Sequence, residues 1–242
     1  MKFRLLAWDS EFLGLSVAEV DPALSSATEL PALLASLKEE GVGLVYFAPE
    51  ADRVGARMAA HAAGGFLADV KLTYHRTIRE SELPAVPGLA GIATASYASP
   101  APNAALRRLA QISNRYSRFR TDPRFAPATC ERLYDIWIER SVSGALATSV
   151  LTALDEGGRE IGLTTLGRKQ DEGDIGLVAV DEAYNRRGVG RLLISEALAR
   201  FRADGLSGVR VVTQQANTGA CILYEKCGFV LKKREYFYHF WL

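Results

Sequence analysis

The chain has 242 residues, 48% of them hydrophobic and 24% charged, which is the composition of a globular protein long enough for one large or two small domains. Its 29 basic and 28 acidic side chains nearly cancel, and this argues against a protein that binds DNA or RNA over a broad surface. No apolar run reaches the roughly 18 to 20 residues of a membrane span, and acidic residues interrupt the N-terminus before a signal-peptide core could form, so we expect a cytoplasmic protein.

The first third of the chain predicts a β-α-β unit. A strand is expected around residues 44–47 (LVYF), a helix over 51–64 (ADRVGARMAAHAAG) and a second strand over 67–78 (LADVKLTYHRTI). Both strands are rich in β-branched and aromatic residues, whereas the helical segment is rich in alanine.

A domain boundary is predicted next. Residues 81–102 concentrate proline, glycine, serine and alanine between two better-patterned regions. We therefore expect a small N-terminal α/β domain at residues 1–85 and a larger domain at residues 90–242.

The larger domain begins with two helical patterns, at residues 103–113 and 128–144. A strand pair follows at 149–167, and its Asp-Glu-Gly-Gly break is typical of a hairpin turn. Residues 174–180 (DIGLVAV) are apolar on both faces, which predicts a strand in the interior of a sheet.

Two segments have the same order of strand, helix, Gly-Phe and strand. They are residues 43–76 and 207–240, which match at Gly-Phe and again at Tyr-His. A degenerate internal repeat would explain this order, and so would two unrelated β-α-β units. Both explanations stay open at this stage.

Cysteine and histidine show no pattern typical of a metal site. Cys130, Cys221 and Cys227 are scattered without a CxxC pair, and the chain has only three histidines. We expect reduced structural thiols and no metal cofactor.

A glycine-rich turn links the strand at 174–180 to an amphipathic helix. In Asn185-Arg186-Arg187-Gly188-Val189-Gly190 the glycines bring the backbone close to a ligand, and the helix that follows adds free N–H groups and a positive dipole end. This arrangement is typical of a phosphate site. A dinucleotide fingerprint or a P-loop would need residues that are absent here, while an ordinary glycine turn with solvated arginines remains the alternative.

The context of this turn resembles the GNAT superfamily of acyl-CoA-dependent N-acetyltransferases. The resemblance covers roughly residues 90 to 242 and implies a central mixed, splayed sheet flanked by helices, an α/β (α+β) fold, here preceded by a smaller degenerate GNAT-like domain. It implies acetyl-CoA as acyl donor, with the pyrophosphate on the glycine turn. The residues that it assigns to the cofactor site are Val178, Ala179, Val180, Arg186, Arg187, Gly188, Val189, Gly190, Arg191 and Asn217.

Tyr224 is the candidate general acid that this resemblance implies. Acyl transfer to an amine expels a CoA thiolate, and a phenol near the sulfur can return a proton because the pKa values of thiols and phenols lie within about two units. The alternative is a helix tyrosine that packs on Phe229. No base is evident, and Glu139, Asp155 or a chain of waters could accept the proton of the ammonium group.

Arginines alternate with aromatic residues between positions 111 and 142. Arg115, Arg118, Arg120 and Arg124 could bind a diphosphate, and Tyr116, Phe119 and Phe125 could stack on a base or a sugar. A solvated surface or a single-stranded nucleic acid site would show the same composition.

A second resemblance favours a nucleotide sugar. AWDSEFLGLSV, SRFR, LYDIWIERSV and RVVTQQANTGACILY are similar to segments of the bacterial two-domain TDP-fucosamine acetyltransferases, which acetylate the 4-amino group of a dTDP-4-amino-4,6-dideoxyhexose for surface polysaccharide. This implies substrate contacts from Arg118, Phe119 and Arg120.

Other functions and features are left open by the sequence. An N-acetyltransferase of a peptide N-terminus, antibiotic or small amine, and a non-catalytic acyl-CoA-binding module, are the alternatives, and a homodimer is not excluded. In AWDSEFLGLSV we interpret Trp8, Phe12 and Leu15 as strand and core residues.

Overall fold

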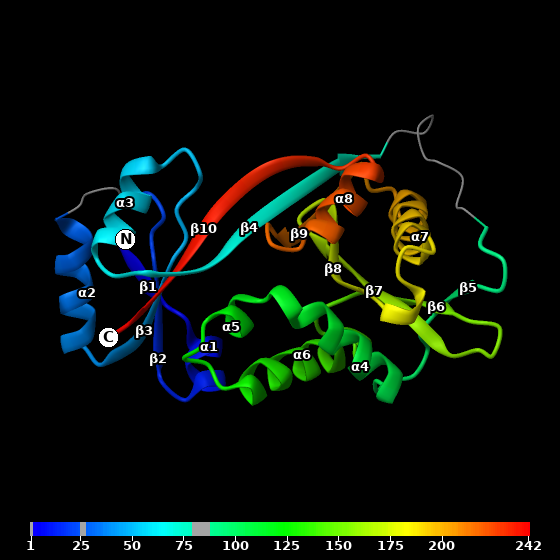
Figure 1. Ribbon diagram of the computed structural model, residues 1–242, viewed down its shortest axis with the longest axis horizontal. Helices are drawn as coiled ribbons and strands as arrows, with labels where there is room; N and C mark the ends of the chain where they lie inside the picture. Colours follow the sequence, from blue (N-terminus) through cyan, green and yellow to red (C-terminus); the bar gives the residue numbers. More distant parts are fainter. Residues whose placement is uncertain (1, 25–27, 79–87) are drawn as a thin grey trace.

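The computed structural model describes residues 2–24, 28–78 and 88–242. In these residues ten strands form one continuous sheet in the order β1-β2-β3-β10-β4-β9-β8-β7-β6-β5 (Figure 1). The strands are β1 (Phe3–Leu5), β2 (Ser16–Val20), β3 (Val42–Phe47), β4 (Phe66–Thr77), β5 (Ala93–Ser96), β6 (Ser149–Leu154), β7 (Glu160–Lys169), β8 (Glu172–Val180), β9 (Gly208–Gln214) and β10 (Val230–Trp241). The helices are α1 (Ala7–Leu13), α2 (Glu29–Glu39), α3 (Val54–Ala62), α4 (Ala104–Ser113), α5 (Arg118–Thr121), α6 (Pro127–Val142), α7 (Val189–Ala203) and α8 (Thr218–Lys226), with short 3₁₀ turns η1 (Asn114–Tyr116) and η2 (Glu182–Tyr184).

Local sequence accounts for the elements that were predicted. Helix α4 begins where the Asn103 side chain accepts a hydrogen bond from the Leu106 N–H at 2.9 Å, and α6 begins with a proline at its first position. The hairpin between β6 and β7 turns at Gly158, whose φ of 75° favours glycine. The predicted helices and strands at 44–78, 103–113, 128–144 and 149–180 are thus confirmed, with ends shifted by a few residues.

Strands β4 and β10 join the two halves of the molecule. Figure 1 shows them side by side across its middle, where they pair in antiparallel fashion from Val230–His75 to His239–Phe66. Strand β4 comes from the N-terminal half but also pairs with β9, and β10 comes from the C-terminal half but also pairs with β3. Each half therefore gives its last strand to the sheet of the other half.

The exchanged strands cross the predicted domain boundary. Residues 79–87, which contain the end of the proposed 1–85 domain, lie outside the described residues. The hydrogen bonds of β4 with β9 and β10 cross from one proposed domain to the other. A division of the chain at this point separates two sequence segments that share one sheet.

The sheet order is symmetric about the β10–β4 pair. On both sides a parallel pair lies next to it, β2 with β3 and β8 with β9, followed by an antiparallel neighbour, β1 or β7. Helices α2 and α3 occupy the same places in the chain order as α7 and α8. An internal repeat would give this topology, and the common origin of the two halves stays a hypothesis.

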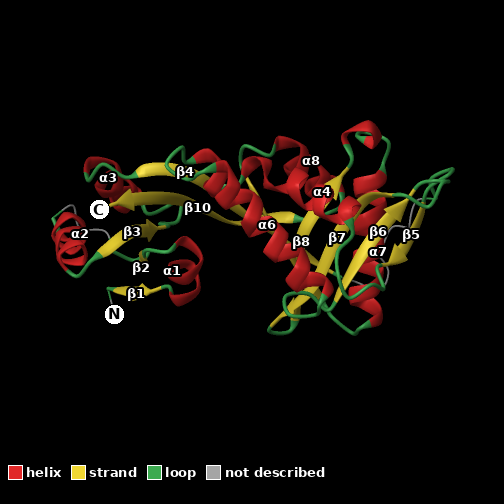
Figure 2. Cartoon of the chain, turned by 90° about the horizontal axis from the view of Figure 1, so that it is seen from below, coloured by secondary structure: helices red, strands yellow, loops and turns green. Residues whose placement is uncertain are grey.

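Buried side chains form separate cores on the two faces of the C-terminal half. Helices α7 and α8 pack on one face, with Leu193, Ile194 and Phe201 in that core. Helices α4 to α6 pack on the opposite face with Leu106, Leu109 and Ile138 (Figure 2). A third core lies under α2 and α3 in the N-terminal half.

The interpretation of Trp8, Phe12 and Leu15 as strand and core residues is wrong in its strand assignment and wrong for Trp8. Residues 7–13 form α1, and Trp8 is 42% exposed, with its ring stacked on Phe12 at a centroid distance of 5.2 Å. Two aromatic residues four positions apart lie on the same side of a helix, and Gly14, with a φ of 70°, ends the helix. Phe12 and Leu15 do pack against the core.

Candidate functional site

Strands β8 and β9 separate after a short parallel pairing. Their pairing ends at Ile175 and Val211, although both strands continue. At the same point Gly176 and Leu177 of β8 together oppose Thr165 of β7, which is a β-bulge. A Cβ on Gly176 would lie 2.5 Å from the Thr165 hydroxyl oxygen, so only glycine fits the bulge. The bulge turns β8 away from β9 and opens the sheet.

The backbone of β8 supplies free hydrogen-bonding groups to this gap. The N–H of Asp181 donates to the Ile161 carbonyl of β7 at 2.8 Å, and the N–H of Leu177 donates to the Thr165 hydroxyl at 2.8 Å. Because backbone groups alternate in direction along a strand, those of Val178 and Val180 point the opposite way, toward the gap. The same alternation turns the backbone groups of Ala179 toward β7, so its assignment to the cofactor site has no support in this geometry.

The glycine turn after β8 forms a concave set of N–H groups. Arg186 and Gly188 both have left-handed backbone, with φ of 61° and 89°. Helix α7 makes its first backbone bond from the Leu192 N–H to the Gly188 carbonyl, at 2.9 Å, which leaves the preceding N–H groups of residues 188–191 without helical partners. Such a nest at the positive end of a helix dipole is suited to an anion.

The arginines of the turn are exposed, and its glycines are tightly placed. Arg186, Arg187 and Arg191 all face solvent, with the Arg187 guanidinium 5.0 Å from the Tyr184 ring. A Cβ on Gly190 would lie 3.1 Å from Leu223 of α8, so the glycine permits close packing of α7 on α8. Val189 is buried in the core beneath. The turn is therefore rigidly held, with its cations free to meet a ligand.

Tyr224 lies on α8, on the same face of the sheet as α7. It is 3% exposed, and its ring contacts those of Tyr74 and Phe229 at centroid distances of 6.0 and 5.9 Å. Burial raises the pKa of the Tyr224 phenol, because the phenolate would lose its hydration. The phenol thus keeps its proton at neutral pH. Asn217 caps α8 by accepting the Ala220 N–H at 3.2 Å, which leaves its amide nitrogen as a donor for a ligand.

The arginines predicted to bind the acceptor do not converge on one point. Arg115 lies 3.6 Å from Glu182 on η2, and Arg120 lies 3.9 Å from Glu131 on α6. Phe119 is 7% exposed and packs against Phe125, so its ring offers no face to a ligand in this conformation. A clamp of four arginines around a diphosphate is not formed.

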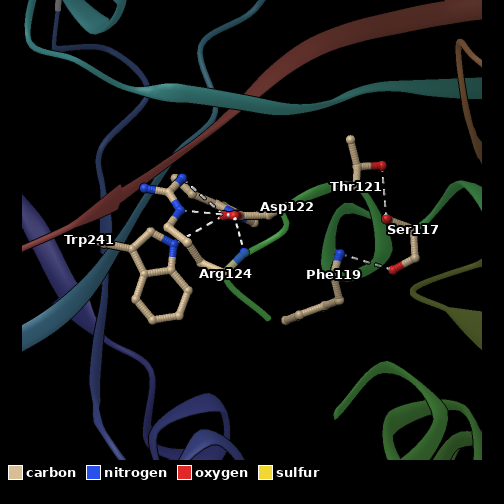
Figure 3. A network of polar contacts seen from close by, with 7 residues as sticks. Ser117, Phe119, Thr121, Asp122, Arg124 and Trp241 are labelled. Atoms are coloured by element: carbon tan, nitrogen blue, oxygen red, sulfur yellow. Dashed lines mark hydrogen bonds and ion pairs between the residues drawn. The ribbon is translucent and has the colours of Figure 1, made fainter. Parts of the chain in front are cut away.

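Arg124, an exposed arginine, belongs to a network around the buried Asp122 (Figure 3). The Asp122 carboxylate accepts hydrogen bonds from Arg124 Nε at 2.9 Å and Trp241 Nε1 at 3.0 Å, and lies 2.9 Å from His239 Nδ1. Burial opposes ionisation of Asp122, but these bonds outweigh it and lower its pKa to about 2. Burial lowers the pKa of His239 to about 4, so the imidazole is neutral at pH 7. The network attaches the loop after α5 to the C-terminal strand.

Arg118 is the arginine that points into the sheet. Its guanidinium lies 4.3 Å from the Phe237 ring and 4.6 Å from the Tyr46 ring, and a terminal nitrogen lies 3.9 Å from Asp9 of α1. Its Nε and the Tyr46 hydroxyl are buried, and neither has a hydrogen-bond partner in the described part of the chain. A polar site with unsatisfied donors is thus present under α5.

Neither proposed base candidate is well placed. Asp155 accepts the N–H of Arg159 at 2.9 Å and the hydroxyl of Tyr184 at 3.1 Å, and these bonds hold the pKa of Asp155 below its usual value despite some desolvation. Glu139 is paired with Arg107 at 2.6 Å on the outer side of α6. Both carboxylates already have partners within the protein.

The family of the protein follows from comparison with known proteins. A model of the Acetyltransferase (GNAT) family matches residues 108–229, about half of the chain and all of the gap, turn and α8. The chain belongs to this family. It is therefore an acetyltransferase, and the predicted GNAT fold is confirmed.

Three proteins similar to this chain are all named acetyltransferases. The dTDP-fucosamine acetyltransferase of Escherichia coli O6:H1 is 28% identical over 96% of this chain and 94% of its own length. The mycothiol acetyltransferase of Nocardia farcinica is 31% identical over 74% of this chain and 58% of its own length. A GCN5-related N-acetyltransferase structure from Sphaerobacter thermophilus has a TM-score of 0.70 at 18% identity, covering 99% of this chain and 76% of its own.

The described residues contain neither a metal-binding cluster nor a long apolar helix. In residues 2–24, 28–78 and 88–242, no three His, Cys, Asp or Glu side chains are grouped to hold a metal ion. In the same ranges no helix combines the length and the apolar character needed to cross a membrane. All three cysteines are free.

The sequence missed part of the polar site under α5. Asp69 of β4 and Tyr134 of α6 lie close enough to Arg118 to feel its charge. Asp69 is a half-buried carboxylate in a strand of mostly apolar alternation, LADVKLTY. A charged residue at such a position was the signal that could have identified it.

Proposed function

We propose that the protein is an acetyl-CoA-dependent N-acetyltransferase acting on the amino group of a nucleotide-linked amino sugar of the dTDP-4-amino-4,6-dideoxyhexose type. The observation that carries the substrate class is the similarity to a dTDP-fucosamine acetyltransferase along 96% of the chain, including the exchanged strands. The three free cysteines suit a reducing compartment, and we assign the reaction to the cytoplasm as a step in polysaccharide biosynthesis.

The residues of the turn and the gap suit acetyl-CoA. The N–H groups of residues 188–191 and the exposed Arg186, Arg187 and Arg191 would hold the pyrophosphate. The backbone groups of Val178 and Val180, together with the amide nitrogen of Asn217, would pair with the amides of the pantetheine arm. When bound, this substrate supplies the activated acetyl group, and the protein supplies position and proton transfer.

Tyr224 is the general acid in this proposal. Its buried phenol is protonated at neutral pH and makes no hydrogen bond to another group within the described residues, so its proton is available. Donation of this proton to the leaving sulfur would avoid release of a free thiolate.

Arg118 is the acceptor-binding residue that the geometry favours. It points inward and has an unsatisfied buried Nε, which an anionic or hydroxyl group of the acceptor could satisfy. Arg120 faces Glu131 and is one-half exposed, so its contact with an acceptor, expected from the resemblance, would need a different rotamer.

The test compares acceptors side by side. The panel contains the free 4-amino-4,6-dideoxyhexose, its dTDP and UDP conjugates and a polyamine, with acetyl-CoA consumption as the readout. We expect the nucleotide conjugates to react best. Loss of one charge-assisted bond of roughly 1.5 to 3 kcal/mol in Arg118→Gln should raise the acceptor KM about 10-fold or more, with the acetyl-CoA KM unchanged.

Arg120→Gln is the matched control, because this neighbouring arginine is paired at the surface. It should change neither KM by more than about 3-fold, within the effect expected of a surface ion pair. Acetylation of the polyamine with no reaction of either nucleotide sugar would refute the proposed substrate class.

A further inference from the structure

The acceptor amine must lose protons, and the position of Tyr224 fixes the face on which a base is needed. Tyr224 belongs to the core formed with α7 and α8. The opposite face of the gap therefore stays available to the acceptor. On that face α4 covers β7 and β8, and α5 covers β4. Between these helices, Val212 and Gln214 of β9 are only half buried.

Asp69 lies on this face, next to the end of β9. The carbonyl of its neighbour Val70 accepts the N–H of Gln215, directly after β9, at 2.8 Å. Val70 and Leu72 pack into the α7–α8 core. Since side chains alternate along a strand, Asp69 points to the other face, where its pairing partner Phe237 belongs to the core under α4 to α6.

The carboxylate of Asp69 differs from its neighbours in having no fixed counter-ion. Glu235 on β10 is held by Lys71 at 2.9 Å and by Lys233 at 3.1 Å, and Asp174 is held by Arg210 at 2.9 Å. In the part of the chain that the structure describes, no cationic side chain lies within ion-pair distance of Asp69. A half-buried carboxylate of this kind is free to exchange a proton with a ligand.

The surroundings of Asp69 also tune its acidity. Burial raises the pKa of Asp69 to about 7, although Arg118, the Val70 amide and Lys71 act to lower it. The groups that face it are Arg118 of α5, Tyr134 of α6 and Lys71 of its own strand, with Glu235 of β10 neutralising Lys71. A base works best when its pKa lies near the working pH.

We propose that Asp69 is the general base that takes the proton of the acceptor ammonium group, an assignment that rests on the proposed N-acetyltransfer. The ammonium gives one proton to the Asp69 carboxylate, and the amine nitrogen then forms a bond to the thioester carbonyl carbon. When the tetrahedral intermediate collapses, the C–S bond breaks and Tyr224 protonates the sulfur. The nitrogen, which is positively charged after the attack, gives one proton to the Tyr224 phenolate and becomes an amide. Asp69 releases its proton to water. One proton is released per acetyl group transferred.

The experiment measures kcat from pH 5.5 to 9.5, at saturating acetyl-CoA, with whichever amine of the panel the wild-type protein acetylates. Asp69→Asn should lower kcat at pH 7 by about 100-fold or more. The loss should shrink as pH rises and the acceptor itself becomes a free amine, while the calorimetric affinity for acetyl-CoA changes by less than about 2-fold. Asp69→Glu should restore part of the rate.

Glu139→Gln is the control, since it removes a carboxylate that is paired on the outer side of α6. It should retain the wild-type rate and pH profile. If Asp69→Asn keeps the wild-type kcat, with the same fall of kcat at low pH, the proposal is wrong. A loss of kcat in Glu139→Gln equal to that in Asp69→Asn would also overturn it. These outcomes are separate from the substrate class, because a polyamine serves the assay as well as a nucleotide sugar.

A second measurement needs no acceptor. The side-chain carboxyl ¹³C resonance of Asp69, assigned by its absence in Asp69→Asn, should titrate with a midpoint near neutral pH in the wild-type protein. A midpoint near 4, the ordinary value for aspartate, would overturn the proposal even if no amine of the panel were acetylated.

Discussion

Gly188 and Gly205 stand at the two ends of α7, and their comparison separates phosphate binding from helix stability. Both have left-handed backbone, with φ of 89° and 76°. Alanine in this conformation costs about 1 to 2 kcal/mol. For a chain of this length that lowers Tm by about 2 to 4 °C per kcal/mol, so each variant should lose roughly 2 to 8 °C. Gly205→Ala adds no contact within 4 Å, and Gly188→Ala places its Cβ 3.3 Å from a methyl carbon of Leu89.

The two variants should differ in their affinity for acetyl-CoA. In Gly188→Ala the strained backbone shifts an N–H that we assign to the pyrophosphate, and one charge-assisted bond is worth roughly 1.5 to 3 kcal/mol. The dissociation constant should therefore rise about 10- to 100-fold. Gly205 lies at the far end of the helix, so Gly205→Ala should leave the dissociation constant unchanged.

Isothermal titration calorimetry and thermal unfolding on the same samples check both expectations. An acetyl-CoA affinity equal to that of the wild type in folded Gly188→Ala would refute the assignment of this turn to the pyrophosphate. An equal loss of affinity in Gly205→Ala would show that general destabilisation of α7, and not the N–H groups of the turn, controls binding.

Two further predictions concern Tyr224 and His239. Tyr224→Phe removes one hydroxyl and little volume, so kcat should fall about 100-fold or more with the acetyl-CoA dissociation constant nearly unchanged; full turnover would make Tyr224 a packing residue. His239 is neutral when folded because burial lowers its pKa to about 4, so its contribution to stability is complete above the unfolded-state pKa of about 6.5 and is lost as pH falls toward 4. Arg118, Arg124 and Asp122 face this imidazole. Between pH 7.0 and pH 4.5 the free energy of unfolding, measured with urea, should fall by at most about 3 kcal/mol, and the fall should be smaller in His239→Asn. An identical pH dependence in that variant would contradict the reasoning.

The glycine turn and its helix were predictable because their signals are local. Residues 185–191 determine a turn through glycine conformational freedom, and the helix that follows is indicated by the spacing of its apolar residues. The same holds for Asn103 as a helix cap and for the β6–β7 hairpin. Each of these features depends on residues a few positions apart, so one short segment contains the whole physical cause.

Strand partners and the acidity of single side chains could not be predicted in this way. The alternation of apolar and polar residues over 66–77 identifies a strand. The same pattern fits a strand at the edge of a sheet, in its centre or in the sheet of the other half equally well. The insertion of β4 between β9 and β10 depends on pairings more than 130 residues away along the chain. Trp8 was misplaced for a related reason, because a seven-residue helix has too few turns to show a clear period.

The pairing of the arginines between positions 115 and 124 also could not be predicted from the sequence. The sequence shows four similar arginines in one short segment. In the structure each of them lies near a different carboxylate, and of the four only Arg118 points inward. Asp69 meets Arg118 and Tyr134 because β4, α5 and α6 pack together. The sequence by itself determined the glycine turn and the helices and strands around it, since these follow from local conformation, and it indicated the GNAT fold through resemblance to a known family. Only the tertiary structure decided which charged groups are paired and which remain free, because desolvation and ion pairing arise between segments distant in the chain.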